Sequence, residues 1–430
     1  MNFQENFIHA IWKYQYFEKR DLKTVAGRVL NIRKIGFHNF HEGPDFRESQ
    51  ITIGNMDFFG NVEVHLKSSD WNAHGHEEDK NYDSVILHVV WEHDLEVRRR
   101  DGSTIPTLEL KGKVFLDVLR NYQRLIANKK ALLCSDFLTE VKGIIKFSML
   151  EKALVERLES KSILINAEVE KTAGDWEEVA YRWLFYCFGF KVNAQSMLKL
   201  ARAMPYKILK KHAGQPLVQE ALLFGQAGFA SLEKPDDFSD FVKREYDFYQ
   251  KKYGLEEPVY RSEWKFMRVR PSNYPSVRLA QLAAILSKTP NLFSMLTNKV
   301  KTIKDLVQIF QVSPNNYWKH HYQLGKKNRK EQNRMLSKEI IHLLGVNFIV
   351  PLWFAYGEYT DDLEWREKCF DFLQTIPPEE NSIISIFLDE GWKPENAFDA
   401  QGMIGLHHGY CSLKKCLSCK IGQNLLRSRG

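Results

Sequence analysis

The chain has 430 residues, of which 44% are hydrophobic and 27% are charged. This composition is that of a globular protein and excludes the disordered, collagen-like and disulfide-scaffold classes. Because a single hydrophobic core stops growing at roughly 250–300 residues, the length predicts two or more domains. The net charge of +7 permits a polyanionic partner without requiring one.

The sequence carries no signal for export or membrane insertion. Glu5 lies where a secretory signal needs a basic start followed by an apolar run. The apolar run over residues 340–356 is interrupted by His342, Asn347 and Pro351, and is shorter than a membrane span requires. We therefore expect a cytoplasmic protein with no membrane partner.

The first 110 residues are predicted to form a mixed β-sheet. A helix is expected at the start, because apolar residues recur at helical spacing at Phe3, Phe7, Ile8, Ile11 and Trp12. Strands are expected at residues 25–35, 49–53, 58–67 and 85–91. The last of these is a continuous apolar run, as in a central strand, and a turn with a short helix should precede it. The predicted order is α-β-β-β-α-β.

After about residue 140 the pattern becomes helical. Leu150, Leu154 and Leu158 lie on one face of a predicted amphipathic helix, and prolines divide the remaining chain into short helices. Residues 220–229, with two glycines among apolar residues, suggest close helix packing. The predicted fold class is α+β, with a sheet domain over residues 1–138 and a larger all-α domain over residues 139–430.

Polar side chains with metal-binding capacity lie on two of the predicted strands. Asp45 opens the second strand after a Gly-Pro turn. The third strand places Glu63, His65 and Lys67 on one face, since side chains two residues apart point the same way. An Asp and a Glu on paired strands can hold Mg²⁺ or Mn²⁺, while a neighbouring base orients water. Phosphodiester cleavage uses such a centre, because the metal neutralises charge on the phosphate.

Through these residues the N-terminal part resembles the PD-(D/E)xK nuclease superfamily, whose core has the same α-β-β-β-α-β order. Pro44-Asp45 and Glu63-Val64-His65 occupy the places of its motif, with His65 at the lysine position. The resemblance implies a restriction-endonuclease-like core in which Asp45 and Glu63 bind the metal. His65, or Lys67 two residues further along the same face, would take the role of the lysine. The resemblance also implies that Glu5 supplies an extra carboxylate and that Tyr82 belongs to the helix after the third strand.

Two other interpretations of the third strand are open. Its alternating face could simply be solvated, as alternation usually indicates. Against this, seven of the 14 histidines fall within 56 residues, at positions 38, 41, 65, 74, 76, 88 and 93. A histidine-based metallohydrolase acting on a small substrate would use His65, His74, His76 and Asp79. His88, inside an apolar strand, is expected to be a core residue.

The last twenty residues hold a cysteine cluster. Cys411, Cys416 and Cys419 have spacings suited to Zn²⁺ or a 4Fe-4S cluster, and a reducing cytoplasm favours a metal over a disulfide. Some nucleases of the superfamily above carry a similar three-cysteine group with a distant fourth cysteine holding a 4Fe-4S cluster. The alternative is three unligated thiols. The fourth ligand could be a lone cysteine, His407 or His408, and the candidate that we carry forward is Cys134. Nearby lysines are expected to lower the thiol pKa values.

Two stretches in the second half combine basic and aromatic side chains, as nucleic-acid grooves do. A solvated charged surface beside core aromatics is the alternative. The residues expected to contact nucleic acid are Arg268, Arg270, Arg278, Trp318, His320 and Lys326.

As a whole, the chain resembles a bacterial family known only as a domain of unknown function. The resemblance runs through residues 43–46, 60–67, 268–275 and 410–422. The preferred hypothesis is a metal-dependent nuclease acting on DNA or RNA. The alternatives are a non-catalytic nucleic-acid-binding protein on a degenerate nuclease core, and the histidine-based metallohydrolase.

Overall fold

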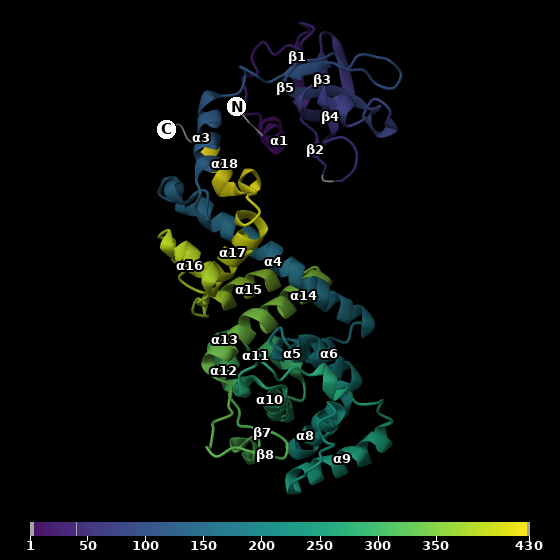
Figure 1. Cartoon of the computed structure of the whole chain (residues 1–430), viewed down its shortest axis with the longest axis vertical. Coiled ribbons are helices and arrows are strands. Elements are labelled where there is room, and N and C mark those ends of the chain that lie inside the picture. Colours follow the sequence, from purple (N-terminus) through teal and green to yellow (C-terminus); the bar gives the residue numbers. More distant parts are fainter. Residues whose placement is uncertain (1–3, 40, 428–430) are drawn as a thin grey trace. The chain divides into compact units, whose positions relative to one another are not determined.

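The computed structural model describes residues 4–39 and 41–427 (Figure 1). Phe3, predicted to belong to the first helix, lies outside the described residues. The chain divides into two compact units, Met1–Met149 with Leu406–Gly430, and Leu150–Gly405. The sequence prediction placed a boundary after residue 138 and assigned the tail to the helical half. In the structure, the tail groups with the sheet instead.

The first unit contains a mixed six-stranded sheet. Five strands follow the order β1-β3-β4-β5-β6, and β2 pairs with β3. The β1–β3, β2–β3 and β3–β4 pairs are antiparallel, whereas β4–β5 and β5–β6 are parallel. The strands are β1 (Leu30–Lys34), β2 (Phe37–His38), β3 (Phe46–Ile53), β4 (Met56–Lys67), β5 (Val85–Glu92) and β6 (Thr107–Glu109).

The strand predictions agree with β1, β3, β4 and β5, although the first strand is shorter than expected. β5 is the central strand that its apolar run predicted: residues 85–90 are all buried, and it lies between β4 and β6. The predicted short helix before it consists of α2 (Asp70–Ala73) and η1 (Lys80–Tyr82). β2 and β6 were not predicted.

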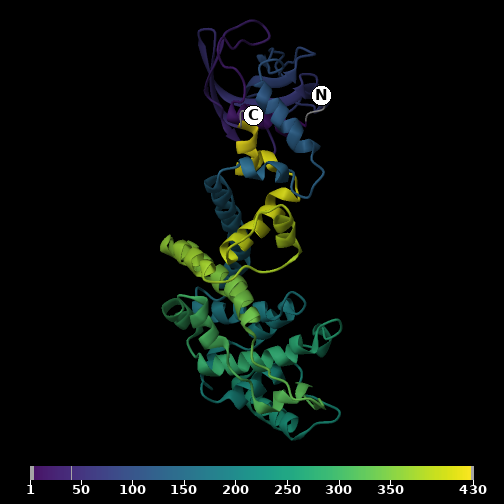
Figure 2. The same cartoon turned by 90° about the vertical axis from the view of Figure 1, so that its left-hand side faces the viewer.

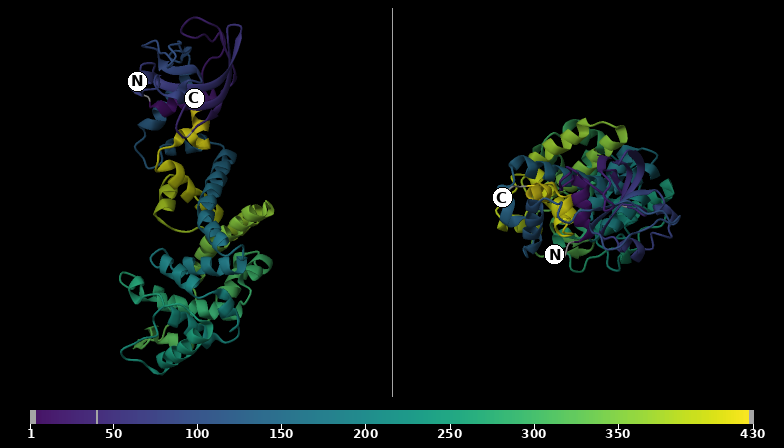
Figure 3. Two further views of the ribbon diagram at one scale, coloured as in Figure 1. Left: turned by 90° about the vertical axis from the view of Figure 1, so that its right-hand side faces the viewer. Right: turned by 90° about the horizontal axis from the view of Figure 1, so that it is seen from above.

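Three helices complete the core of the first unit: α1 (Glu5–Tyr14), α3 (Leu116–Ala127) and α18 (Lys420–Arg427). The amphipathic α1 buries Phe7, whose ring stacks on Tyr122 of α3 at a centroid distance of 3.8 Å. The C-terminal α18 contributes Leu426 to the same core and lies beside α3 (Figures 2 and 3). A segment nearly 300 residues away in sequence thus completes the N-terminal unit.

The second unit is mainly helical. It begins within α4 (Gly143–Lys171). The helices that follow are α5 (Trp176–Phe188), α6 (Ala194–Ala203), α7 (Tyr206–Lys210), α8 (Pro216–Gln226), α9 (Asp237–Tyr253), α10 (Pro275–Lys288), α11 (Leu292–Lys299), α12 (Ile303–Phe310), α13 (Lys338–Leu344), α14 (Val350–Thr360), α15 (Glu364–Gln374), α16 (Ser382–Asp389) and α17 (Ala397–Leu406). It also contains a short hairpin, β7 (His321–Gln323) and β8 (Lys326–Lys327), so this part is not purely α-helical as predicted.

One helical stretch of the second unit, Lys338–Thr360, is long and apolar enough to span a membrane by length and composition. It comprises α13, the π-helix η6 (Gly345–Ile349) and α14. In its most apolar 18-residue window, 72% is buried inside the protein, as in a core helix. Trp353 and Phe348, for example, have no exposed surface.

Candidate metal centre

Asp45 and Glu63 come together where β3 begins beside β4. The Asp45 backbone N–H donates to Glu63 Oε2 at 3.1 Å, and the Val64 N–H donates to Asp45 Oδ2 at 3.0 Å. Each carboxylate therefore accepts a hydrogen bond from the backbone of the other strand. This reciprocal arrangement fixes both carboxylates at the same end of the strand pair, as the sequence predicted.

Helix α1 adds two more titratable groups at this point. His9 Nε2 lies 3.2 Å from Asp45 Oδ2 and 3.6 Å from Glu5 Oε1. Glu5 and His9 are one helical turn apart, so they share a face of the helix that packs on β4. Glu5 was implied by the nuclease resemblance, whereas His9 was not predicted. The signal available in the sequence was its position four residues after Glu5, which places both side chains on one face of the helix.

Three histidines form a compact group beside Glu63. Ligand nitrogens of His65, His74 and His76 all lie within 4.8 Å of one another. His74 Nδ1 is 3.2 Å from His65 Nε2. Glu63 Oε1 lies 3.3 Å from His76 Nε2 and 3.5 Å from His65 Nε2. β4 supplies Glu63 and His65, and the loop after α2 supplies the other two histidines.

These spacings suit a single metal ion. Four ligands at about 2.1 Å from a tetrahedral ion lie about 3.4 Å from one another. The 3.2 Å contact between His65 and His74 matches that separation, and the ligand nitrogens of the three histidines all lie within 4.8 Å of one another. Glu63 lies 3.5 Å from His65 and 3.3 Å from His76, beside this group. Imidazole-rich sites favour Zn²⁺ and other transition metals over Mg²⁺. The residues present therefore fit Zn²⁺ better than the Mg²⁺ or Mn²⁺ of the sequence hypothesis.

His88, on the neighbouring strand β5, contacts the histidine group through His65. It is fully buried on β5, and its Nε2 lies 2.9 Å from His65 Nδ1. Because this contact engages Nδ1, the Nε2 atom of His65 is left facing the other two histidines. Metal-binding histidines are commonly oriented through their second nitrogen in this way. His88 is thus a core residue, as predicted, with a specific contact to the site.

Burial and crowded charge perturb the site strongly. Burial and the negative charge of Asp45 raise the pKa of Glu63 to about 9. Burial and the neighbouring His76 and His74 lower the pKa of His65 to about 3, so its imidazole is neutral at pH 7. Burial opposes the charged form of His9, but the contact with Asp45 and the negative charges of Asp45 and Glu5 together raise its pKa. Burial thus favours the neutral forms of His65 and His76, in which an imidazole binds a metal, and the protonated form of Glu63.

The structure decides between two interpretations of the β4 face. Glu63 and His65 are only 4% and 1% exposed, so the solvated-face interpretation is wrong for both. Lys67 is exposed at the end of β4, opposite Glu92 on β5, and is not part of the buried group. Asp79, a suggested fourth ligand, instead caps η1 by accepting from the Asn81 N–H at 2.9 Å.

Tyr82, which the nuclease resemblance placed in the helix after the third strand, ends η1 and packs beside this centre. Its ring stacks on His76 at a centroid distance of 3.7 Å. Burial and the nearby carboxylate of Glu63 raise its pKa to about 12, so the phenol stays protonated.

The four predicted cysteine ligands all belong to the first unit. Cys134 precedes η2 (Ser135–Glu140), Cys411 ends the π-helix η7 (His407–Cys411), Cys416 starts η8 (Cys416–Ser418), and Cys419 follows it. The expectation that lysines lower the thiol pKa values is wrong. Burial and neighbouring thiols raise the pKa of Cys416 to about 11 and that of Cys411 further, and the Lys420 ammonium donates to the Ser148 hydroxyl.

Two of the residues expected to contact nucleic acid are structural. Arg278 is 2% exposed and donates to Gln281 at 2.8 Å, and Trp318 is fully buried and donates to Glu220. Buried side chains are not available to a polynucleotide, so the prediction is wrong for these two. Arg268, Arg270 and Lys326 are exposed, and His320 is half-buried.

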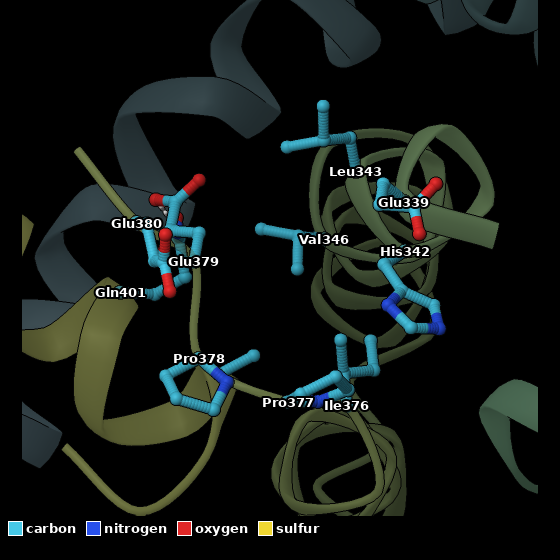
Figure 4. A pocket seen from close by; sticks show the side chains of 11 residues that line it. Glu339, His342, Leu343, Val346, Ile376, Pro377, Pro378, Glu379, Glu380 and Gln401 are labelled. Atoms are coloured by element: carbon cyan, nitrogen blue, oxygen red, sulfur yellow. Dashed lines mark hydrogen bonds between the residues drawn. The ribbon is translucent and has the colours of Figure 1, made fainter. Parts of the chain in front are cut away.

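A pocket that was not predicted lies inside the helical unit. Figure 4 shows Glu379 and Gln401 on one side of it and His342 and Val346 on the other. Gln401 donates to Glu379 at 2.7 Å and accepts from Arg157 at 3.0 Å. The pocket is therefore bordered by a hydrogen-bonded network, in contrast to the compact donor group of the first unit.

The chain belongs to the family described as Protein of unknown function (DUF2851), whose model matches residues 5–382. This confirms the resemblance to an uncharacterised family. No curated protein and no solved structure matches the chain, and no comparison supports the resemblance to the PD-(D/E)xK superfamily. The matched region contains the whole histidine and carboxylate group and Cys134, and it ends before the other three cysteines.

Proposed function

We propose that the first unit is a metal-dependent phosphodiesterase with nucleic acid as its substrate class. The observation that carries the proposal is the group of His65, His74 and His76 beside Glu63, with donor atoms spaced as around one ion. A divalent ion held there would polarise the phosphate and lower the pKa of bound water. The predicted order α-β-β-β-α-β, to which the structure adds β2 and β6, and the place of Asp45 and Glu63 in it support the choice of phosphodiesters.

The surrounding residues have separate tasks in this proposal. Glu63 completes the donor set. The backbone N–H of Asp45 holds the Glu63 carboxylate in place through a hydrogen bond of 3.1 Å. His9, whose pKa is raised, lies between two carboxylates and can carry a proton to the departing oxygen. Tyr82 packs on His76 and keeps that imidazole in place.

One observation favours the non-catalytic alternative. The family motif that the sequence resembles ends in a lysine, and the nearest one, Lys67, is exposed and outside the group. A degenerate core would bind nucleic acid in a salt-dependent manner without cleaving it.

The test is a cleavage assay on the purified chain with added Zn²⁺ or Mn²⁺, using plasmid DNA, RNA and an activated phosphodiester. His74→Ala and Glu63→Gln should each lose at least about 100-fold in rate, because each removes a ligand or its neighbour. His41→Ala, at an exposed histidine outside the group, is the matched control. Equal cleavage by wild type and both site variants would exclude the centre as the catalyst, and binding without cleavage would support the alternative.

A further inference from the structure

The pocket of the second unit combines apolar walls with several carboxylates. Its volume of about 520 Å³ is within the range of small-molecule sites. It is bordered by α13 with η6, by the segment between α15 and α16, and by α17. The apolar side chains Leu343, Val346 and Ile376 belong to its walls, and its charged lining residues are Glu339, Glu379 and Glu380.

The carboxylates lie at two ends of the pocket. Figure 4 shows Glu379 and Glu380 on one side, opposite Glu339, with the apolar side chain of Val346 between the two ends. Among the described residues that line the pocket, none is a lysine or an arginine. Burial lowers the pKa of His342, so this imidazole does not offset the charge of Glu339 at pH 7. Two anionic ends separated by apolar surface match a ligand with two cationic ends and a hydrocarbon middle.

Glu379 is held in position without being neutralised. Gln401, which is only 3% exposed, donates to Glu379 Oε1 at 2.7 Å and accepts from Arg157 Nε at 3.0 Å. Within the described part of the chain, Oε2 of Glu379 accepts no hydrogen bond and the carboxylate forms no salt bridge. An ammonium group would supply that missing partner, and because the carboxylate is already ordered, binding would cost little side-chain entropy.

The other cation that interacts with Glu379 is engaged elsewhere. Lys161 donates to Asn347 Oδ1 at 2.8 Å, and burial lowers its pKa to about 7. Asn347 and the wall residue Val346 both belong to the π-helix η6. Such π-helical turns are rare and occur frequently at functional sites. The same local irregularity therefore shapes the apolar wall and places the acceptor that holds Lys161.

We propose that this pocket binds an aliphatic diamine or polyamine. One ammonium group would lie at Glu379 and Glu380 and another at Glu339, with the methylene chain along Val346 and Leu343. Charge-assisted hydrogen bonds fix the two ends of such a ligand, and burial of its methylene groups adds affinity. The site belongs to the second unit and does not depend on the function proposed for the first.

The test is isothermal titration calorimetry of the full chain with spermidine and with 1,6-diaminohexane, 1,6-hexanediol and adipate, which have equally long carbon chains. Both amines should bind, and the diol and the dicarboxylate should bind at least about 10-fold more weakly, because they lack the cationic ends. Glu379→Gln and Glu339→Gln should each weaken amine binding about 10-fold or more. Glu395→Gln, at an exposed glutamate outside the lining, should bind as the wild type does.

The ligand series on the wild-type chain decides even if a variant fails to fold. Equal binding of diol and diamine, binding of adipate in place of the amines, or no amine binding to protein shown to be folded by circular dichroism would overturn the proposal. An equal loss in Glu395→Gln would also overturn it, since the attraction would then be non-specific. Failure of the cleavage assay with amine binding intact would count against the proposed function alone.

Discussion

At the scale of single residues, the centre depends on contacts that the sequence shows only in part. Glu63 and His65 could be predicted to share a face, because strand periodicity requires it. The meeting of His65 with His74 and His76 was predicted only by the metallohydrolase alternative. The burial of the face could not be predicted, since it depends on how the loop after α2 folds back. His9 was missed because its spacing from Glu5 indicates a shared helix face but not that Asp45 will lie 3.2 Å away.

A first residue-scale prediction concerns His88, which orients His65 through the 2.9 Å contact between their rings. His88→Gln should weaken Zn²⁺ affinity about 10- to 100-fold, because the ring of His65 loses its second contact. Competition titration with a chromophoric chelator measures the affinity. His93→Gln, at a histidine just beyond the end of β5, is the control. Unchanged affinity in His88→Gln would show that the ring contact has no role in positioning.

A second residue-scale prediction concerns Glu168, a buried carboxylate in α4. Burial disfavours its charge, but hydrogen bonds from Arg202, Lys171 and Arg182 lower its pKa to about 2. A carboxyl whose pKa is lower in the folded state stabilises the fold above its unfolded pKa. That contribution is fully present above about pH 4.5 and is lost as the pH falls through 2.

Glu168→Gln should therefore lower the free energy of unfolding by about 3 kcal/mol at pH 7, since the partly buried Arg182 and the exposed Arg202 and Lys171 lose the buried carboxylate that they contact. The difference between wild type and variant in urea midpoints should shrink as the pH falls from 5 toward 2. A difference that is independent of pH would contradict the assignment.

At the scale of elements, the predictions succeed where the pattern is local. The apolar run of β5 and the alternation of β4 could be recognised directly. β6 has three residues and exists because β5 pairs with it, and a three-residue strand leaves no periodicity to recognise. The close helix packing predicted at residues 220–229 is confirmed, because a Cβ at Gly225 of α8 would lie 1.9 Å from Tyr246 Cγ of α9.

The element-scale prediction follows from that contact. Gly225→Ala should lower the free energy of unfolding by about 1–3 kcal/mol, because α8 and α9 must separate to admit a methyl group. Thermal and urea denaturation measure the loss. Gly143→Ala is a matched control, since a Cβ there meets no heavy atom within 4 Å. Equal stability of the two variants would show that the α8–α9 contact is looser than described.

At the scale of the whole molecule, the sequence predicts two parts but not how the chain is divided between them. The tail follows a long helical region, so proximity in sequence assigns it there. In the structure it belongs to the first unit, because Leu426 and the partly buried Leu417 pack into the core of the sheet. Contacts between residues hundreds of positions apart leave no local pattern in the sequence. For this reason Cys134 was only one of several candidates for the fourth ligand of the cysteine cluster.

The whole-molecule prediction tests this attachment. Leu426→Ala should destabilise the first unit by about 2–5 kcal/mol, because the residue is 1% exposed in its core. Leu413→Ala, at a tail residue that is 56% exposed, should have little effect. Limited proteolysis and denaturation report both. Equal behaviour of the two variants would mean that the tail is not part of this core.

The most direct test of the central claim is an anomalous diffraction map of crystals grown with Zn²⁺. The account predicts a zinc peak within about 2.0–2.2 Å of His65 Nε2, His74 Nδ1 and His76 Nε2, with Glu63 alongside. The same crystals of His74→Ala should lose that peak. A map from wild-type crystals with no zinc among these histidines would contradict the account.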